Sequence, residues 1–209
     1  SESAEVRAFP TALADEVRAV LPQLSDCQWH PPAAGFQVQV RGETIDIPYR
    51  VYYSESQVLS CANRPGVQGL IALCLGTRHH DGYLRETCVK RLIEIEEPWV
   101  VPFIIQLVGE YVVTIVKLIE QALPNLNTAL YTEFIAANRA YFETIGRRTI
   151  SYWDAYYRNE YSNCKDYPGV ESMPRFTALA AQVDRLLGTD TQPKAAASQH
   201  GLRAGQLRR

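Results

Sequence analysis

The sequence predicts a mainly α-helical protein, either a helical bundle or an α-solenoid-like domain, built around one long buried helix. Three observations predict it: an apolar stretch Glu96–Leu123 that is too long for a strand, helical spacing of apolar residues in most of the remaining chain, and one short segment with strand-like alternation. We expect residues 1–188 to form a single domain. Residues 189–209 contain almost no large apolar side chain, so we expect a flexible tail.

The stretch Glu96–Leu123 is predicted to be one continuous helix enclosed by other elements. Pro98 suits a first helical position, and acidic residues precede it at the positive end of the helix dipole. Its few later polar residues recur at spacings that place them on one narrow stripe: Gln106, Glu110, Thr114, Lys117 and Gln121. Because the charges of Glu110 and Lys117 would be costly in lipid, we expect the centre of a packed domain and not a membrane span.

The remaining elements follow from local periodicity. Alternating apolar residues on both sides of a glycine-containing turn predict a β-hairpin over residues 36–53. Apolar residues at helical spacing predict helices over residues 10–24, 54–62, 67–75, 81–95, 127–146, 147–161 and 173–187. Asp81 and either Asn127 or Thr128 are expected N-caps, and Gly146 is expected to end a helix.

One segment carries a family resemblance. Asp81–Leu92 (DGYLRETCVKRL) resembles the first helix of a HEAT-type repeat, in which Asp, a small apolar residue and Arg recur at this spacing. The segment Pro98–Phe103 resembles the start of the second helix. The resemblance covers about one repeat, within residues 81–120, and implies a helical hairpin of the solenoid kind. It implies no particular chemistry.

Composition narrows the class of function. The chain has 209 residues, a formal net charge of -2, 46% hydrophobic and 21% charged residues, which is ordinary for a globular protein and gives no electrostatic case for nucleic acid. Its five cysteines contain no CxxC pair, and the N-terminus has no secretory pattern, so we expect reduced thiols in a cytoplasmic protein. No phosphate-binding or dinucleotide motif predicts a cofactor.

Two candidates for catalysis have competing structural interpretations. The run His79, His80 and Asp81 is the basis of the alternative function, a metal-assisted hydrolase, but adjacent side chains diverge, and we favour a helix start capped by Asp81. Glu110 is either a buried general acid or base, or one half of an ion pair with Arg or Lys from a neighbouring helix, or part of a solvated strip with Gln106 and Lys117.

Nucleophilic chemistry finds little support in the sequence. Cys27 and His30 are close enough to form a Cys–His pair, but no third orienting group is visible. The chain has neither a GxSxG motif nor any other catalytic signature that we recognise.

The aromatic segment after Gly146 is the predicted partner-binding site. Aromatic and arginine side chains dominate binding hot spots in protein interfaces. The residues concerned are Arg147, Arg148, Tyr152, Trp153, Tyr156, Tyr157 and Arg158. The competing interpretation is that one face of this helix is core and the other a satisfied tyrosine network. The sequence therefore predicts a non-enzymatic protein-binding protein, for example an immunity or antitoxin-like inhibitor that occludes a partner protein.

Overall fold

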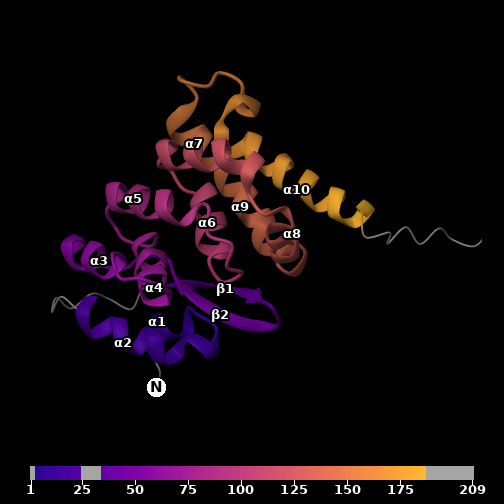
Figure 1. Ribbon diagram of the computed structural model, residues 1–209. Coiled ribbons are helices and arrows are strands. Elements are labelled where there is room, and N and C mark those ends of the chain that lie inside the picture. Colours follow the sequence, from indigo (N-terminus) through magenta and orange to yellow (C-terminus); the bar gives the residue numbers. More distant parts are fainter. Residues whose placement is uncertain (1–2, 25–33, 187–209) are drawn as a thin grey trace, which may run out of the picture.

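The computed structural model describes the backbone of residues 3–24 and 34–186, and these residues are mainly helical with one two-stranded sheet (Figure 1). The predicted mainly α class with a small hairpin is confirmed. The predicted tail over 189–209 and the pair Cys27 and His30 lie outside the described residues. The elements are α1 (Ala4–Arg7), α2 (Ala14–Leu24), β1 (Gly35–Val40), β2 (Glu43–Pro48), α3 (Glu55–Ala62), α4 (Val67–Gly76), α5 (Gly82–Leu92), α6 (Val101–Val108), α7 (Val113–Ala122), α8 (Thr128–Ala137), α9 (Arg139–Tyr152) and α10 (Pro168–Leu186).

The hairpin turns where the sequence predicts. Arg41 and Gly42 both have positive φ, 48° and 86°, which is the geometry of a two-residue turn that matches the twist of the strands. Its apolar face is buried through Phe36, Val38, Val40, Ile45 and Ile47. The second strand ends at Pro48, earlier than the predicted residue 53. Beyond it, Val51 forms an isolated parallel bridge with His79.

The predicted single helix over Glu96–Leu123 is wrong in two respects, because the stretch forms two helices and the first begins at Val101, so Pro98 lies in the preceding turn and not at the first helical position. Helix α6 ends at Val108 and α7 begins at Val113, with a four-residue break between them. At Gly109 the backbone leaves the helical region (φ -90°, ψ 32°), and a Cβ there would lie 3.1 Å from Ile145 Cγ2 of α9. Apolar residues continue on both sides of the break, so hydrophobic periodicity does not reveal it.

The break also divides the predicted polar stripe. Gln106 and Glu110 are buried, at 2% and 3% exposure, whereas Thr114 and Gln121 are exposed. Every residue of α6 is buried, and burial continues on either side of it through Trp99, Val100, Gly109 and Glu110, so the enclosed part of the stretch is residues 99–110. Among the described residues, no helix combines the length and the apolarity needed to cross a bilayer.

Two helices begin where the sequence predicts, and in both a side chain caps the N-terminus. Asp81 accepts from Leu84 N at 3.0 Å, and Asn127 accepts from Leu130 N at 3.3 Å, as predicted. The predicted end at Gly146 is wrong, since α9 runs through it to Tyr152. The helix boundary lies instead at Asn138, which receives a hydrogen bond from Gln39 N at 2.7 Å and donates one to Gln39 O at 2.8 Å. Pairing with β1 across 99 residues fixes this boundary, and local sequence does not.

The helices form an N-terminal group, α1 to α5, and a C-terminal group, α6 to α10. Figure 1 shows α1, α2 and the hairpin at one end of the molecule and α7 at the other, with α6, α8 and α9 between them. Helix α6 contacts α7, α8 and α9, and α10 lies against α7, α8 and α9. On the N-terminal side, α1 packs on β2 and α4 contacts α2, α3 and α5. This arrangement brings the segment after β2, the end of α4 and the start of α5 to the α6–α7 break.

Candidate binding surface

Glu110, in the break between α6 and α7, is held by three arginines. Arg50, just after β2, donates from Nη1 to Oε1 at 3.0 Å and from Nη2 to Oε2 at 3.3 Å. Arg78, just after α4, donates from Nη2 to Oε1, and Arg85 of α5 places Nε 3.1 Å from Oε2. The side chains of Arg78 and Arg85 are completely buried. The cluster therefore joins three segments to the break.

The charge state of Glu110 follows from these neighbours. Burial by itself would raise the pKa of Glu110, but the charges of Arg78, Arg50 and Arg85 outweigh burial and hold the pKa below its ordinary value. A carboxylate that stays ionised, with arginine nitrogens at both oxygens, is poorly suited to act as a general acid or base at neutral pH. The ion-pair interpretation of Glu110 therefore fits this geometry. Lys117 takes no part in it and pairs with Glu160 at 3.6 Å.

A group of three tyrosines lies beside this cluster, and we call it the tyrosine face: Tyr111, Tyr152 and Tyr156. The ring centroids are 6.1 Å apart for Tyr111 and Tyr152, 6.4 Å for Tyr111 and Tyr156, and 6.2 Å for Tyr152 and Tyr156. Tyr156 is 68% exposed and Tyr111 44% exposed. The guanidinium of Arg85 lies 5.8 Å from the Tyr111 ring centroid, so the face rests directly on the Glu110 cluster.

Helix geometry separates the seven predicted site residues into two sides. Arg148, Tyr152 and Tyr156 are spaced by four residues and share one side of α9 and of the π-helical turn, Trp153–Tyr157, that follows it. Arg147 is exposed, and its side chain donates to Thr144 Oγ1 of the same helix at 2.7 Å.

The other side of the π-helical turn packs against the loop that leads to α10. Trp153 donates from Nε1 to the carbonyl of Tyr161 at 2.7 Å, and the Tyr157 ring stacks on Tyr167 at 5.3 Å. Arg158 lies over the Trp153 ring and pairs with Asp154. These three predicted site residues therefore have intramolecular partners. Trp153 and Arg158 are not brought to the tyrosine face, whereas Tyr157 lies behind it, with its ring centroid 6.5 Å from that of Tyr156 and its hydroxyl donating to the Tyr111 carbonyl.

The His79–His80–Asp81 run has structural roles in this fold. His79 donates from Nε2 to Tyr53 O at 2.9 Å, and its Nδ1 accepts from Asp81 N at 3.1 Å. Burial lowers the pKa of His79, which favours this neutral form. The His80 ring stacks on Tyr52, and Asp81 caps α5. Both nitrogens of His79 are engaged, and within the described part of the chain no three His, Cys, Asp or Glu side chains gather as metal ligands would.

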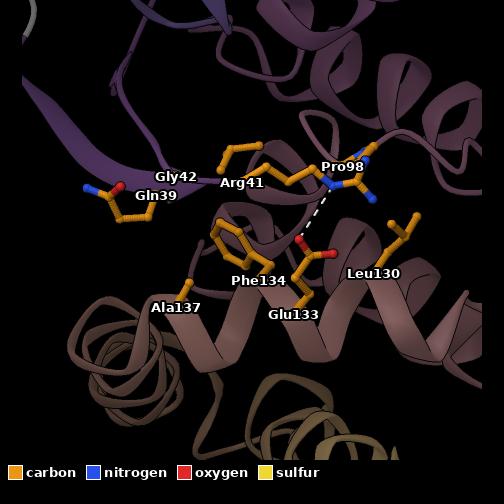
Figure 2. A pocket seen from close by; sticks show the side chains of 9 residues that line it. Gln39, Arg41, Gly42, Pro98, Leu130, Glu133, Phe134 and Ala137 are labelled. Carbon is orange, nitrogen blue, oxygen red and sulfur yellow. Dashed lines mark ion pairs between the residues drawn. The ribbon is translucent and has the colours of Figure 1, made fainter.

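A separate cavity of about 170 Å³ lies between the hairpin turn and α8. Figure 2 shows Arg41 reaching from the turn towards Glu133 of α8, with Nε 3.4 Å from Oε1. Both side chains are more than half exposed, so this ion pair contributes little stability. The rest of the lining is mostly apolar, including Pro98, Leu130 and Phe134. Nothing in this lining indicates a specific chemistry.

Sequence reasoning missed several residues of the surface: Tyr49, Arg50, Arg78, Arg85 and Tyr111. Arg50 and Arg78 lie 60 and 32 positions from Glu110, so no spacing rule connects them. One signal was available, since a glutamate within an apolar stretch requires a buried partner of opposite charge. The sequence does not say which arginine supplies it.

Comparison with known proteins leaves the resemblance to a HEAT-type repeat untested. No protein family, no curated protein and no solved structure matches the chain. The predicted first helix corresponds to α5, and the predicted second helix to α6 and its preceding turn. Function must therefore be argued from the surface itself.

Proposed function

We propose that this protein binds another protein without catalysing a reaction, and that the tyrosine face is its contact surface. The observation that carries the proposal is the tyrosine face itself, three tyrosine rings in mutual contact, two of them substantially exposed. Tyrosine buries a large area on binding at low cost in side-chain entropy and keeps a hydroxyl for hydrogen bonds. An exposed group of such rings is a typical binding hot spot.

The hydrogen bonds beneath the tyrosine face support the proposal. The Tyr157 hydroxyl donates to the Tyr111 carbonyl and accepts from Val113 N at 3.3 Å, so the π-helical turn is tied to the α6–α7 break. A surface held in one arrangement before binding loses less entropy when the partner docks. The form of function that we put forward is an inhibitor of the immunity or antitoxin type, which covers the working surface of its partner.

The surroundings favour protein over nucleic acid as the partner. If nucleic-acid bases stacked on the tyrosine rings, the phosphate backbone of the nucleic acid would need exposed cations along its path. Of the arginines near the tyrosine face, Arg78 and Arg85 are completely buried on Glu110, Arg50 pairs with the same carboxylate, and Arg158 pairs with Asp154. The whole chain has a net charge of -2. The metal-assisted hydrolase has no comparable support, because His79 and Asp81 have the structural roles described above.

A capture experiment with matched variants tests the proposal. The full chain, Tyr156→Ala, Tyr152→Ala and Ile150→Ala are immobilised and incubated with extract of the native cell, and the captured proteins are identified and then purified for titration. Ile150 is the control because it is 51% exposed on the same helix. It lies two residues from both Arg148 and Tyr152, which places it about 200° around the helix axis from them. We expect one partner whose affinity falls about 30-fold with Tyr156→Ala or Tyr152→Ala and is unchanged with Ile150→Ala.

Two results would count against the tyrosine face. One is a purified partner that binds all four proteins equally. The other is a partner that is lost only with Ile150→Ala, which would move the contact surface to the opposite side of α9. Circular dichroism of each variant confirms that the helices are intact before binding is compared.

A further inference from the structure

A cavity of about 330 Å³ opens next to the tyrosine face. Its lining combines residues of the Glu110 cluster, the segment after β2 and the exposed side of α9: Tyr49, Arg50, Gln106, Gly109, Glu110, Arg148 and Tyr152. Tyr152 belongs both to this lining and to the tyrosine face. A molecule that covers the face can therefore reach into the cavity.

The cavity and the groups behind it carry an excess of positive charge. Arg50, Arg78 and Arg85 all contact the single carboxylate of Glu110. Arg148 adds a fourth guanidinium, whose Nη2 donates to the Tyr49 hydroxyl at 3.1 Å and whose Cζ lies 5.0 Å from the Tyr49 ring centroid. Four cations therefore surround one anion.

The hydrogen-bond donors are in excess as well. Behind the cavity, Nε and Nη1 of Arg78 and Nη2 of Arg85 have no hydrogen-bond partner within residues 3–24 and 34–186. Both side chains are completely buried and neither lines the cavity, so they add positive charge behind its wall and no donor that a ligand in the cavity contacts. Over the same part of the chain, no carboxylate lies within ion-pair distance of Arg148. A guanidinium presents its N–H groups in a planar fork that matches a carboxylate. Arg50 pairs with Glu110, so Arg148 is the guanidinium of the cavity wall that lacks a carboxylate partner among the described residues.

The lining also decides which anion fits. The lining itself holds two guanidinium groups, Arg50 and Arg148, and one carboxylate, Glu110, so its net charge of one positive unit matches a monoanion better than a dianion such as phosphate. Tyr49 and Tyr152 supply apolar ring surface on which the methylene groups of an acidic side chain can pack. A single carboxylate on a short aliphatic stem satisfies both conditions.

We propose that the cavity between Arg50 and Arg148 binds the carboxylate of an aspartate or glutamate side chain of the partner protein. This inference rests on the proposed function, because it names the chemistry of the partner at the edge of the tyrosine face. Arg148 contacts the ligand carboxylate directly. Tyr49 is a positioning residue that orients the Arg148 guanidinium.

The test uses this protein alone, with a small carboxylate as the probe. N-acetyl-glutamate α-amide is titrated into the full chain and followed by NMR at the Arg148 Nε–H and at the ring of Tyr152. N-acetyl-glutamine α-amide, which has the same shape without the charge, is the matched probe. We expect a saturable shift with the carboxylate and none with the amide. We expect Arg148→Gln to weaken binding at least about tenfold, and Arg148→Lys, which keeps the charge and loses the fork, to weaken it less.

Arg147→Gln is the control variant, because Arg147 is the adjacent arginine, its side chain donates to Thr144, and it does not line the cavity. Equal shifts with carboxylate and amide, equal losses for Arg147→Gln and Arg148→Gln, or tighter binding of inorganic phosphate would each overturn the assignment. The two proposals also fail separately. If the carboxylate probe binds but no partner protein depends on Tyr156, the proposed function is wrong and the cavity site remains. If a partner protein depends on Tyr156 but its affinity is unchanged by Arg148→Gln, the cavity site is wrong and the proposed function remains.

Discussion

Replacing Glu110 with glutamine should strongly destabilise the fold. The substitution keeps the size of the side chain and removes the one carboxylate that, within residues 3–24 and 34–186, pairs with Arg50, Arg78 and Arg85. Two of these guanidinium groups are completely buried, so water cannot replace the lost partner. Glutamine can accept from one arginine, but its NH₂ group then faces the N–H groups of another.

The magnitude follows from the burial of the cluster. Removing one member of a buried ion pair costs about 3–5 kcal/mol, because the remaining charge stays in a poorly solvated site. For a chain of this length, about 1 kcal/mol corresponds to a Tm change of roughly 2–4 °C. We therefore expect Glu110→Gln to lower Tm by roughly 6–20 °C. Folded domains are typically stable by about 5–15 kcal/mol, so this is a large fraction of the total.

Urea unfolding followed by circular dichroism measures this difference. Glu160→Gln is the matched control, because Glu160 pairs with Lys117 at 3.6 Å with both side chains about half exposed. An exposed pair of this kind contributes about 0–1 kcal/mol, so the control should stay close to the parent protein. The reasoning is refuted if Glu110→Gln costs less than about 1 kcal/mol, or no more than Glu160→Gln does.

Two further predictions concern charge and capping. The pKa of Glu110 is lower in the folded protein than its ordinary value of 4.5, so its contribution to stability is complete above about pH 4.5 and is lost as the pH falls through the folded value. The difference in unfolding free energy between the parent protein and Glu110→Gln should therefore shrink below pH 4.5, and a difference that is constant from pH 7 to pH 3 would contradict this. Asp81→Ala should cost about 0.5–2 kcal/mol through loss of the α5 cap, and Asp81→Ser should restore most of it. Urea unfolding with and without EDTA checks the second prediction. If Asp81 bound a metal ion, the loss of unfolding free energy in Asp81→Ala would differ between the two conditions.

The sequence predicts those parts of the fold that depend on local chemistry. Alternation and the Arg41–Gly42 turn place the hairpin, and the Asp81 and Asn127 caps start two helices where expected. The errors occur where distant contacts override local preference. Glycine at 146 is tolerated inside α9, whereas Asn138 ends α8 because its side chain bonds to β1.

The candidate surface is only partly visible in the sequence for the same reason. Helical spacing groups Arg148, Tyr152 and Tyr156, and this grouping is present in the structure. Spacing cannot show that Tyr111 joins them from the α6–α7 break, or that Trp153 and Tyr157 are engaged by the loop before α10. The predicted set of seven therefore mixes surface residues with structural ones.

The α6–α7 break connects the stability of the fold to the proposed binding surface. If the helix continued through Gly109, Glu110 and Tyr111 would be successive residues of one regular α-helix. The break lets Glu110 point into the arginine cluster while Tyr111, the next residue, is 44% exposed on the tyrosine face. Arg85 contacts both, at 3.1 Å from the Glu110 carboxylate and 5.8 Å from the Tyr111 ring centroid. The same ion cluster that fixes the core therefore fixes the position of one rim of the surface, which is why a carboxylate in the adjoining cavity would meet a preformed site.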